Sequence, residues 1–229
     1  MIDVHSHVLP FVDDGSPSVN KSLQMLQESA NQGITDVFLT PHYRHPYEKG
    51  VAEIKKAFDD FYGVVKEKGI PIKLYLGQEI FVGEKDVKAD LNEGNLLTMA
   101  NSKGVLLEFD YVRPLDIAGI VYEIKNAGYI PIVAHVERYA YLTFMDIVEI
   151  KSLGGMIQVN ADSIVGKDRA RKKLVKKLYK YGLVDMVASD VHFGRENLMG
   201  KAHEYVYKKF GQAAAEVTFY VNANKLIRG

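Results

Sequence analysis

Apolar residues recur along the chain at the alternating three- and four-residue spacing that is typical of amphipathic helices. Each segment with this spacing is followed by a glycine, and glycine is favoured after a helix because it adopts a left-handed backbone conformation easily. A short apolar run follows each glycine directly. The pattern predicts helices over residues 18 to 32, 50 to 68, 114 to 128, 143 to 154 and 168 to 181.

The apolar runs between the helices predict seven strands. They lie near residues 2 to 5, 34 to 40, 72 to 79, 104 to 108, 130 to 135, 156 to 160 and 184 to 189. Continuous apolar strands that alternate with helices indicate a parallel sheet covered on its outer face, and this many repeats favour closure into a (β/α)7 barrel. An open, doubly wound sheet is the alternative, because the pattern does not fix the strand order. No linker, repeat or low-complexity segment divides the chain, so residues 1 to 229 are predicted to form a single domain.

Composition places the chain among ordinary globular proteins, with 47% hydrophobic and 25% charged residues. Lys plus Arg equals Asp plus Glu at 29 each, so no overall field attracts nucleic acid. There is no apolar run of membrane-spanning length and no basic segment leading into an apolar one at the N-terminus, so we expect a cytoplasmic protein that does not span a membrane. The absence of cysteine excludes thiolate metal sites and a cysteine nucleophile.

Residues with metal-binding side chains lie at the ends of the predicted strands. The first strand ends in His5-Ser6-His7, and alternate strand residues point to the same side, so both imidazoles can reach one ion. A single polar strand end is ordinarily a structural group, but six of the seven strands end in this way, and the carboxyl ends of barrel strands share one face. Asp13 and Asp14 follow the first strand on that face. The candidate ligands are His5, His7, Asp14, His42, Glu79, Glu108, His135, Asp190 and His192.

The donor set limits the choice of metal. Five imidazoles and four carboxylates without sulfur suit Mn, Fe, Zn or Co better than Ca or Mg. Nine ligands exceed the needs of one ion and predict two or three, with a carboxylate such as Glu79 bridging them. Divalent ions would make this pocket favourable for a phosphate dianion.

These residues, in this order, resemble those of the PHP superfamily of polymerase-associated domains and histidinol phosphatases. A finer match lies in the motifs Met1-Ile-Asp-Val-His-Ser-His, Asp13-Asp-Gly, Gly77-Gln-Glu-Ile, Leu106-Leu-Glu-Phe, Ala134-His-Val-Glu-Arg-Tyr and Ala188-Ser-Asp-Val-His. In these motifs the chain is similar to the manganese-dependent protein tyrosine phosphatases encoded beside bacterial capsule and exopolysaccharide genes. The resemblance implies a distorted (β/α)7 barrel and a three-metal site. It also implies a substrate, the phosphotyrosine tail of a membrane-associated, autophosphorylating tyrosine kinase that controls polysaccharide export.

The resemblance also implies a role for individual residues. It assigns His5, His7, Glu79 and Asp190 to one metal, Glu79, Glu108 and His135 to a second, and Asp14, His42 and His192 to a third. Arg138 and Arg195 would bind phosphate. The match is less direct at Arg195, because the loop after His192 is shorter than in the family.

The same residues are compatible with other functions. Histidinol phosphate hydrolysis on the same scaffold is the nearest alternative, for which Asp110 would bind the substrate amine. A metal-binding or regulatory module without catalysis is the alternative from another class. His45 and His203 are expected to be solvated. Arg44 is expected to be a surface charge, with contact to substrate as the alternative. The basic residues between 167 and 180 predict a solvated helix face, with an anionic membrane or an acidic kinase tail as the alternative partner.

Overall fold

The computed structural model describes residues 1–83 and 86–228. All five predicted helices are confirmed within two or three residues at each end. Side chains cap four of them at the N-terminus: Ser18, Asp116, Thr143 and Asp168 each accept a hydrogen bond from a backbone N–H in the first turn. The five helices are α1 (Val19–Asn31), α2 (Val51–Glu67), α4 (Ile117–Asn126), α5 (Phe144–Ser152) and α7 (Arg169–Lys180).

Further helical elements lie between these helices and at the C-terminal end of the chain. They include the α-helices α3 (Val87–Glu93), α6 (Ala161–Val165), α8 (Met199–Phe210), α9 (Gln212–Glu216) and α10 (Asn222–Arg228). Two 3₁₀ turns cover Met99–Asn101 and Val136–Arg138, and a π-helical turn covers Val217–Val221. No helix in the described ranges is both long and apolar enough to cross a membrane.

Strands form at all seven predicted positions, but two of the predicted strands are each divided in two. The second divides around Pro41, which has no N–H to donate to a neighbouring strand, and the third divides at Gly77 and Gln78. The strands are β1 (Ile2–Ser6), β2 (Asp36–Leu39), β3 (His42–Tyr43), β4 (Lys73–Leu76), β5 (Glu79–Phe81), β6 (Gly104–Glu108), β7 (Ile130–Val133), β8 (Met156–Asn160) and β9 (Met186–Ala188).

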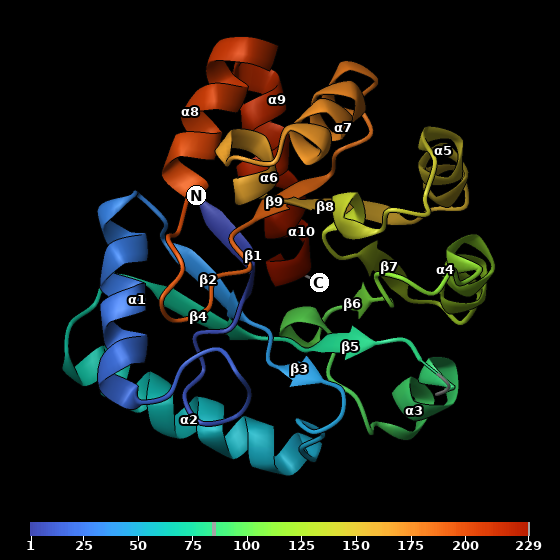
Figure 1. Ribbon diagram of the computed structural model, residues 1–229. Helices are drawn as coiled ribbons and strands as arrows, with labels where there is room; N and C mark the ends of the chain where they lie inside the picture. Colours follow the sequence, from blue (N-terminus) through green and yellow to red (C-terminus); the bar gives the residue numbers. More distant parts are fainter. Residues whose placement is uncertain (84–85, 229) are drawn as a thin grey trace.

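The strands form two parallel sheets that continue into one another through the divided strands. One sheet has the order β1-β2-β4 and the other β3-β5-β6-β7-β8-β9. The two ends of this series meet, because the N–H of Asp190 donates to the carbonyl oxygen of His5 (2.8 Å) and the N–H of His7 to that of Val191 (3.1 Å). The strands therefore curve around a common interior, with the helices outside them, as Figure 1 shows. This arrangement argues against the open, doubly wound alternative.

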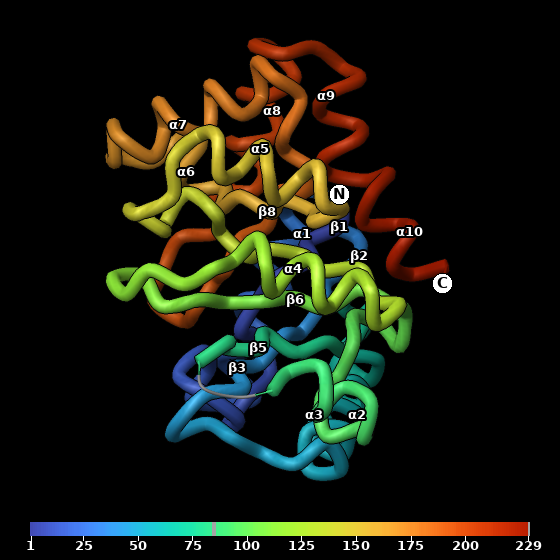
Figure 2. Tube along the Cα trace, turned by 90° about the vertical axis from the view of Figure 1, so that its right-hand side faces the viewer, coloured from blue at the N-terminus to red at the C-terminus, as the bar shows by residue number. Residues whose placement is uncertain are grey.

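The alternation of side chains along the strands separates an inner core from an outer one. Inward-facing residues such as Val4, Phe38, Leu106 and Ile132 form a small buried cluster with Leu226 of α10. Outward-facing strand residues pack against the surrounding helices in a larger cluster. Helix α10 lies behind the strands in the view of Figure 1 and at one side of the molecule in Figure 2. The interior is thus filled by side chains, and the strand ends remain for polar groups.

Candidate metal centre

The pairing between β1 and the segment after β9 builds the first part of the site. It brings the His5 and His7 imidazoles beside the carboxylate of Asp190, whose Oδ1 lies 3.7 Å from His5 Nε2 and 3.4 Å from His7 Nε2. The two imidazole nitrogens themselves are 3.1 Å apart. Residues nearly two hundred positions apart in the sequence therefore converge on one point.

Glu79, the first residue of β5, lies at the centre of the cluster. Its Oε1 is 2.8 Å from His135 Nε2 and 3.3 Å from His5 Nε2. Its Oε2 is 2.7 Å from His42 Nδ1 and 3.3 Å from His7 Nε2. One carboxylate thus faces four imidazoles, which is the arrangement expected of a group that bridges two cations.

Eight of the nine candidate ligands fall into groups of three whose donor atoms lie within 4.8 Å of one another. Every member of these groups is buried. Two of the groups contain Glu79, and each of the other two shares a histidine, His5 or His42, with one of these, so the groups form one continuous cluster. The groups are His5–His7–Asp190, His5–Glu79–His135, His42–Glu79–Glu108 and His7–His42–His192.

The chemistry of this donor set fits bound cations. His42 Nδ1 and Glu79 Oε2 are 2.7 Å apart, yet they are not aligned for a hydrogen bond, and within the described part of the chain neither atom has a hydrogen-bond partner. Buried polar atoms ordinarily find partners, and cations between converging imidazoles and carboxylates would satisfy them.

Asp14 and Arg195 lie at the edge of the cluster. The Asp14 side chain is 41% exposed, and its Oδ1 is 3.5 Å from His42 Nε2 and 3.6 Å from His192 Nε2. Arg195 is exposed and lines the recess above the cluster. The structure therefore brings both residues to the site but leaves them more accessible than the other candidates.

A second layer of side chains orients the candidate ligands. Asp13 Oδ2 lies 2.8 Å from His7 Nδ1 and also accepts the N–H of His42 at 3.0 Å. Gln158 Oε1 accepts the N–H of His135 at 2.8 Å, and the Asn160 amide donates to Asp190 Oδ2 at 2.9 Å. Such outer contacts fix the orientation of a ligand. The two amide residues were missed in the sequence because amides are uncommon ligands for these metals, although both lie on a strand that ends at the site.

Two of the candidate ligands have an unusual backbone conformation. His135 has a φ of 32° and Asp190 a φ of 49°, in the left-handed region that residues with a side chain rarely adopt. Each lies two residues after the end of a strand, where the turn aims the side chain into the cluster. Backbone strain of this kind is concentrated at functional sites.

Cationic and phenolic groups complete the site. Arg138 Nη1 contacts Asp190 Oδ2 at 2.7 Å, and Arg44 Nη1 contacts Glu108 Oε1 at 3.3 Å. The Tyr111 hydroxyl donates to the same Glu108 oxygen at 2.7 Å. The prediction that Arg44 is a surface charge is therefore wrong. Only its position two residues after His42, on the strand-end face, could have indicated this role.

Burial and neighbouring charges shift the pKa values of the clustered side chains in different directions. Burial disfavours ionisation of Glu79, but the neighbouring imidazoles, foremost that of His5, hold its pKa well below the usual range. The pKa of Glu108 is raised, first by burial and then by the charge of Glu79. Burial together with the charge of His7 lowers the pKa of His192 to about 4. Neutral imidazole is the form that binds a cation.

The remaining two histidines lie outside the cluster. His45 is exposed, as predicted. His203 is not fully solvated, because its ring packs edge-on against Phe219 with ring centroids 5.1 Å apart, and this half-buried position corrects the prediction.

The recess above the cluster has a volume of about 160 Å³ and is lined by candidate ligands, by Tyr111 and by Arg44, Arg138 and Arg195.

The fold and the site together define a parallel α/β protein with a buried histidine and carboxylate cluster at its strand ends. The chain belongs to the CpsB/CapC family of capsular polysaccharide synthesis, whose model matches residues 1–228. Among curated relatives, the tyrosine-protein phosphatase YwqE of Bacillus subtilis is 32% identical over 84% of this chain and 77% of its own. The tyrosine-protein phosphatase CpsB of Streptococcus pneumoniae is 30% identical over 99% and 98% of the two chains.

A solved structure shows a similarity to the same group of proteins. It comes from work on YwqE from Bacillus subtilis and CpsB from Streptococcus pneumoniae, described as unique metal-dependent tyrosine phosphatases. It matches this chain with a TM-score of 0.92 and 29% identity, covering 100% of this chain and 94% of the other. The similarity extends over the whole arrangement of strands and helices that positions the cluster.

Proposed function

We propose that this chain is a metal-dependent protein tyrosine phosphatase. The observation that carries the proposal is the recess itself, in which a buried histidine and carboxylate cluster lies beside Arg44 and Arg138, in a member of a family whose relatives are tyrosine-protein phosphatases. Hydrolysis breaks the bond between phosphorus and the phenolic oxygen, forms a bond from phosphorus to a water oxygen, and leaves a proton on the phenol.

The cofactor we propose is a set of two or three divalent ions, with manganese preferred over iron, zinc or cobalt. His5, His7, Glu79 and Asp190 would hold one ion, and Glu79, Glu108 and His135 a second. When bound, such ions lower the pKa of water and neutralise phosphate charge. The converging donor atoms of Glu79 support its role as the shared ligand.

Asp14, His42 and His192 would hold a third ion in this scheme. The distances from Asp14 Oδ1 to the two imidazoles, 3.5 and 3.6 Å, support this grouping. Because Asp14 is the exposed member, this ion would be the most accessible of the three.

The arginines would bind the phosphoryl group. The Arg138 guanidinium is a planar fork that matches two phosphate oxygens, and its contact with Asp190 fixes its position above the cluster. Arg195, at the exposed edge of the recess, would close over the same oxygens. Arg44 supplies a third cation in this recess. Positive charge placed in advance stabilises the charge that develops on the phosphoryl oxygens.

The substrate we infer is the phosphotyrosine tail of a membrane-associated bacterial tyrosine kinase, and the setting is the cytoplasm. Exposed apolar side chains on the loops after β1, β6 and β9, namely Phe11, Val112 and Phe193, support a macromolecular substrate. Exposed apolar groups on one face of a protein are characteristic of an interaction surface. The family's part in capsular polysaccharide synthesis supports a role in regulating that pathway.

Histidinol phosphate is the less favoured substrate. Its amine would need a carboxylate beside the recess, for which Asp110 was the candidate. Asp110 instead accepts hydrogen bonds from the N–H groups of Val112 (2.8 Å) and Arg113 (2.7 Å), and it is absent from the described lining of the recess. Its carboxylate thus stabilises a turn.

We also infer that residues 1–229 act as a single domain, a distorted barrel of seven strand positions. The contact between the ends of β1 and β9 and the continuity of the divided strands support this interpretation.

The test is turnover of a phosphotyrosine peptide by the manganese-loaded protein, measured beside histidinol phosphate and a phosphoserine peptide. We expect kcat/KM to be at least tenfold higher for the phosphotyrosine peptide than for the other two. Equal rates on all three would contradict the proposed specificity, and no turnover of any would contradict the enzymatic function.

A further inference from the structure

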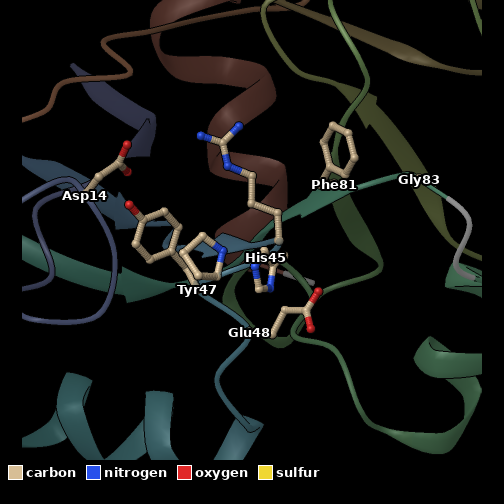
Figure 3. Close-up of a pocket in the computed structure, with 8 residues that line it drawn as sticks. Asp14, His45, Tyr47, Glu48, Phe81 and Gly83 are labelled. Carbon is tan, nitrogen blue, oxygen red and sulfur yellow. The ribbon is translucent and has the colours of Figure 1, made fainter. Parts of the chain in front are cut away.

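Two hollows adjoin at the metal cluster. The polar recess of about 160 Å³ contains the candidate ligands. The second, a mostly apolar cavity of about 600 Å³ shown in Figure 3, lies among the loop after β3, the end of β5 and Asp14. Asp14 and Arg44 line both hollows. A ligand can therefore extend from one into the other past these two side chains.

The volumes of the two hollows indicate which part of a phosphomonoester each could hold. The recess is smaller than sites for small molecules, which are about 300–1,000 Å³, and equals roughly five water volumes at about 30 Å³ each. A phosphoryl group would occupy it once ions are bound, and the rest of the substrate would lie outside. The adjoining cavity is within the range for small molecules, so it has room for that remaining part.

Two of the residues that line the second cavity, Tyr47 and Phe81, carry aromatic six-membered rings. Tyr47 and Phe81 lie on either side of it in Figure 3. The Tyr47 ring is stacked at 21° to the ring of His42, with centroids 6.3 Å apart, and Phe81 follows Glu79 by two residues on β5. Both walls are thus positioned by residues of the metal cluster. A Cβ at Gly83 would lie 3.2 Å from the Phe81 ring, so a larger residue at this position would crowd the ring.

We propose that this cavity binds the aromatic ring of the substrate, with the phosphotyrosine ring between Tyr47 and Phe81 and the phosphoryl group in the recess. The inference rests on the proposed function and adds to it a specificity subsite for aryl phosphates. The ester oxygen then lies at the junction, next to Arg44 and Asp14. Aromatic rings pack favourably in offset or edge-to-face arrangements, and a substrate ring in this cavity could pack in this way against either residue.

The experiment separates binding of the ring from binding of phosphate. Benzylphosphonate, which carries a ring and is not hydrolysed, and inorganic phosphate are titrated into the manganese-loaded protein by calorimetry. Tyr47→Leu and Phe81→Leu keep apolar bulk but remove an aromatic wall. Each should weaken benzylphosphonate binding roughly two- to tenfold, the usual worth of one aromatic contact, and leave phosphate binding unchanged.

Two control variants keep the test specific. Tyr47→Phe retains the ring and should bind both ligands like the wild type. Tyr122→Leu removes an exposed tyrosine of α4, outside both hollows, and should also have no effect. Manganese content and Tm are measured for every variant, so that loss of the cluster is separated from loss of the subsite.

The outcomes distinguish this inference from the proposed function. If Tyr47→Leu and Phe81→Leu leave benzylphosphonate binding unchanged, or weaken phosphate equally, the subsite is wrong even where a phosphotyrosine peptide is turned over. A loss of ring binding in Tyr47→Phe would also overturn it. If the wild type binds benzylphosphonate as expected but does not hydrolyse a phosphotyrosine peptide, the proposed function is wrong and the cavity binds another aryl ligand.

Discussion

Glu79 is the residue on which the cluster depends most. It faces four imidazoles at distances between 2.7 and 3.3 Å. Glu79→Gln keeps the shape of the side chain but removes its charge, so the protein should lose at least one ion. Its kcat should fall by more than roughly a hundredfold, as expected when a group that stabilises transition-state charge is removed. Metal analysis and peptide turnover measure both effects. The matched variant Glu123→Gln, on the exposed face of α4, should retain both, and equal behaviour of the two would remove Glu79 from the ligand set.

Arg138 allows a test of phosphate binding that leaves the metals in place. Arg138→Lys keeps the charge but loses the planar fork, so kcat/KM on a phosphotyrosine peptide should fall by roughly ten- to a thousandfold. Asp190 would still be held by the Asn160 amide at 2.9 Å, and metal content should stay normal. The exposed Arg169→Lys is the control. Near-native kinetics would exclude Arg138 from phosphate binding, whereas metal loss would make it a support for Asp190.

At the scale of single residues, the sequence predicted which side chains would meet but not how they are held. His5, His7 and Asp190 were predictable because each lies at the end of an apolar strand, and parallel strand ends share a face. Gln158 and Arg44 were not, because an amide inside a strand and a cation in a loop have many structural roles. Their role follows from contacts with His135 and Glu108, which only the fold defines.

At the scale of elements, the bounds of five helices were predictable from apolar spacing and the glycine after each, whereas α3, α6, α8 to α10 and the division of two strands were not. Capping residues such as Thr143 act within one turn, so the local sequence determines them. The break at Gly77 depends on close packing, since a Cβ there would lie 2.6 Å from the Met99 sulfur. The position of α10 under the strands also depends on contacts with distant residues, which periodicity does not reveal.

The loop after β1 gives a prediction at this scale. A Cβ at Gly15 would lie 2.1 Å from the carbonyl oxygen of His7 and 2.3 Å from its Cβ, so Gly15→Ala must displace the loop that carries Asp13 and Asp14. We expect reduced activity and weaker binding of one ion, measured by turnover against manganese concentration. Gly63→Ala is the matched control in α2, where a Cβ meets nothing within 4 Å. It should raise stability by about 0.5–1 kcal/mol at unchanged activity. Unaltered manganese dependence in Gly15→Ala would show that the loop adapts.

At the scale of the whole molecule, the cluster joins β1, β3, β5, β6 and the segments after β7 and β9. An ion held by groups from the first strand and from the segment after the last strand would stabilise the fold as well as support the chemistry, since it would bind the folded state and not the unfolded one. The five imidazoles and the buried carboxylates would otherwise face one another without complete hydrogen bonding. Metal binding and stability should therefore change together.

Removal of metal tests this coupling directly. At a manganese concentration of 100 times Kd, binding adds about 2.7 kcal/mol, so a chelator should lower Tm by roughly 5–10 °C for a chain of this length, and it should abolish turnover. Restoring manganese should restore both. Thiol alkylation should change neither, because the chain has no cysteine. Asp190→Asn removes the charge of a candidate ligand that lies beside the imidazoles of His5 and His7. In this variant, manganese should raise Tm less than in the wild type. A Tm that does not respond to chelator, in a protein that keeps its activity, would show that the cluster needs no metal either for folding or for catalysis.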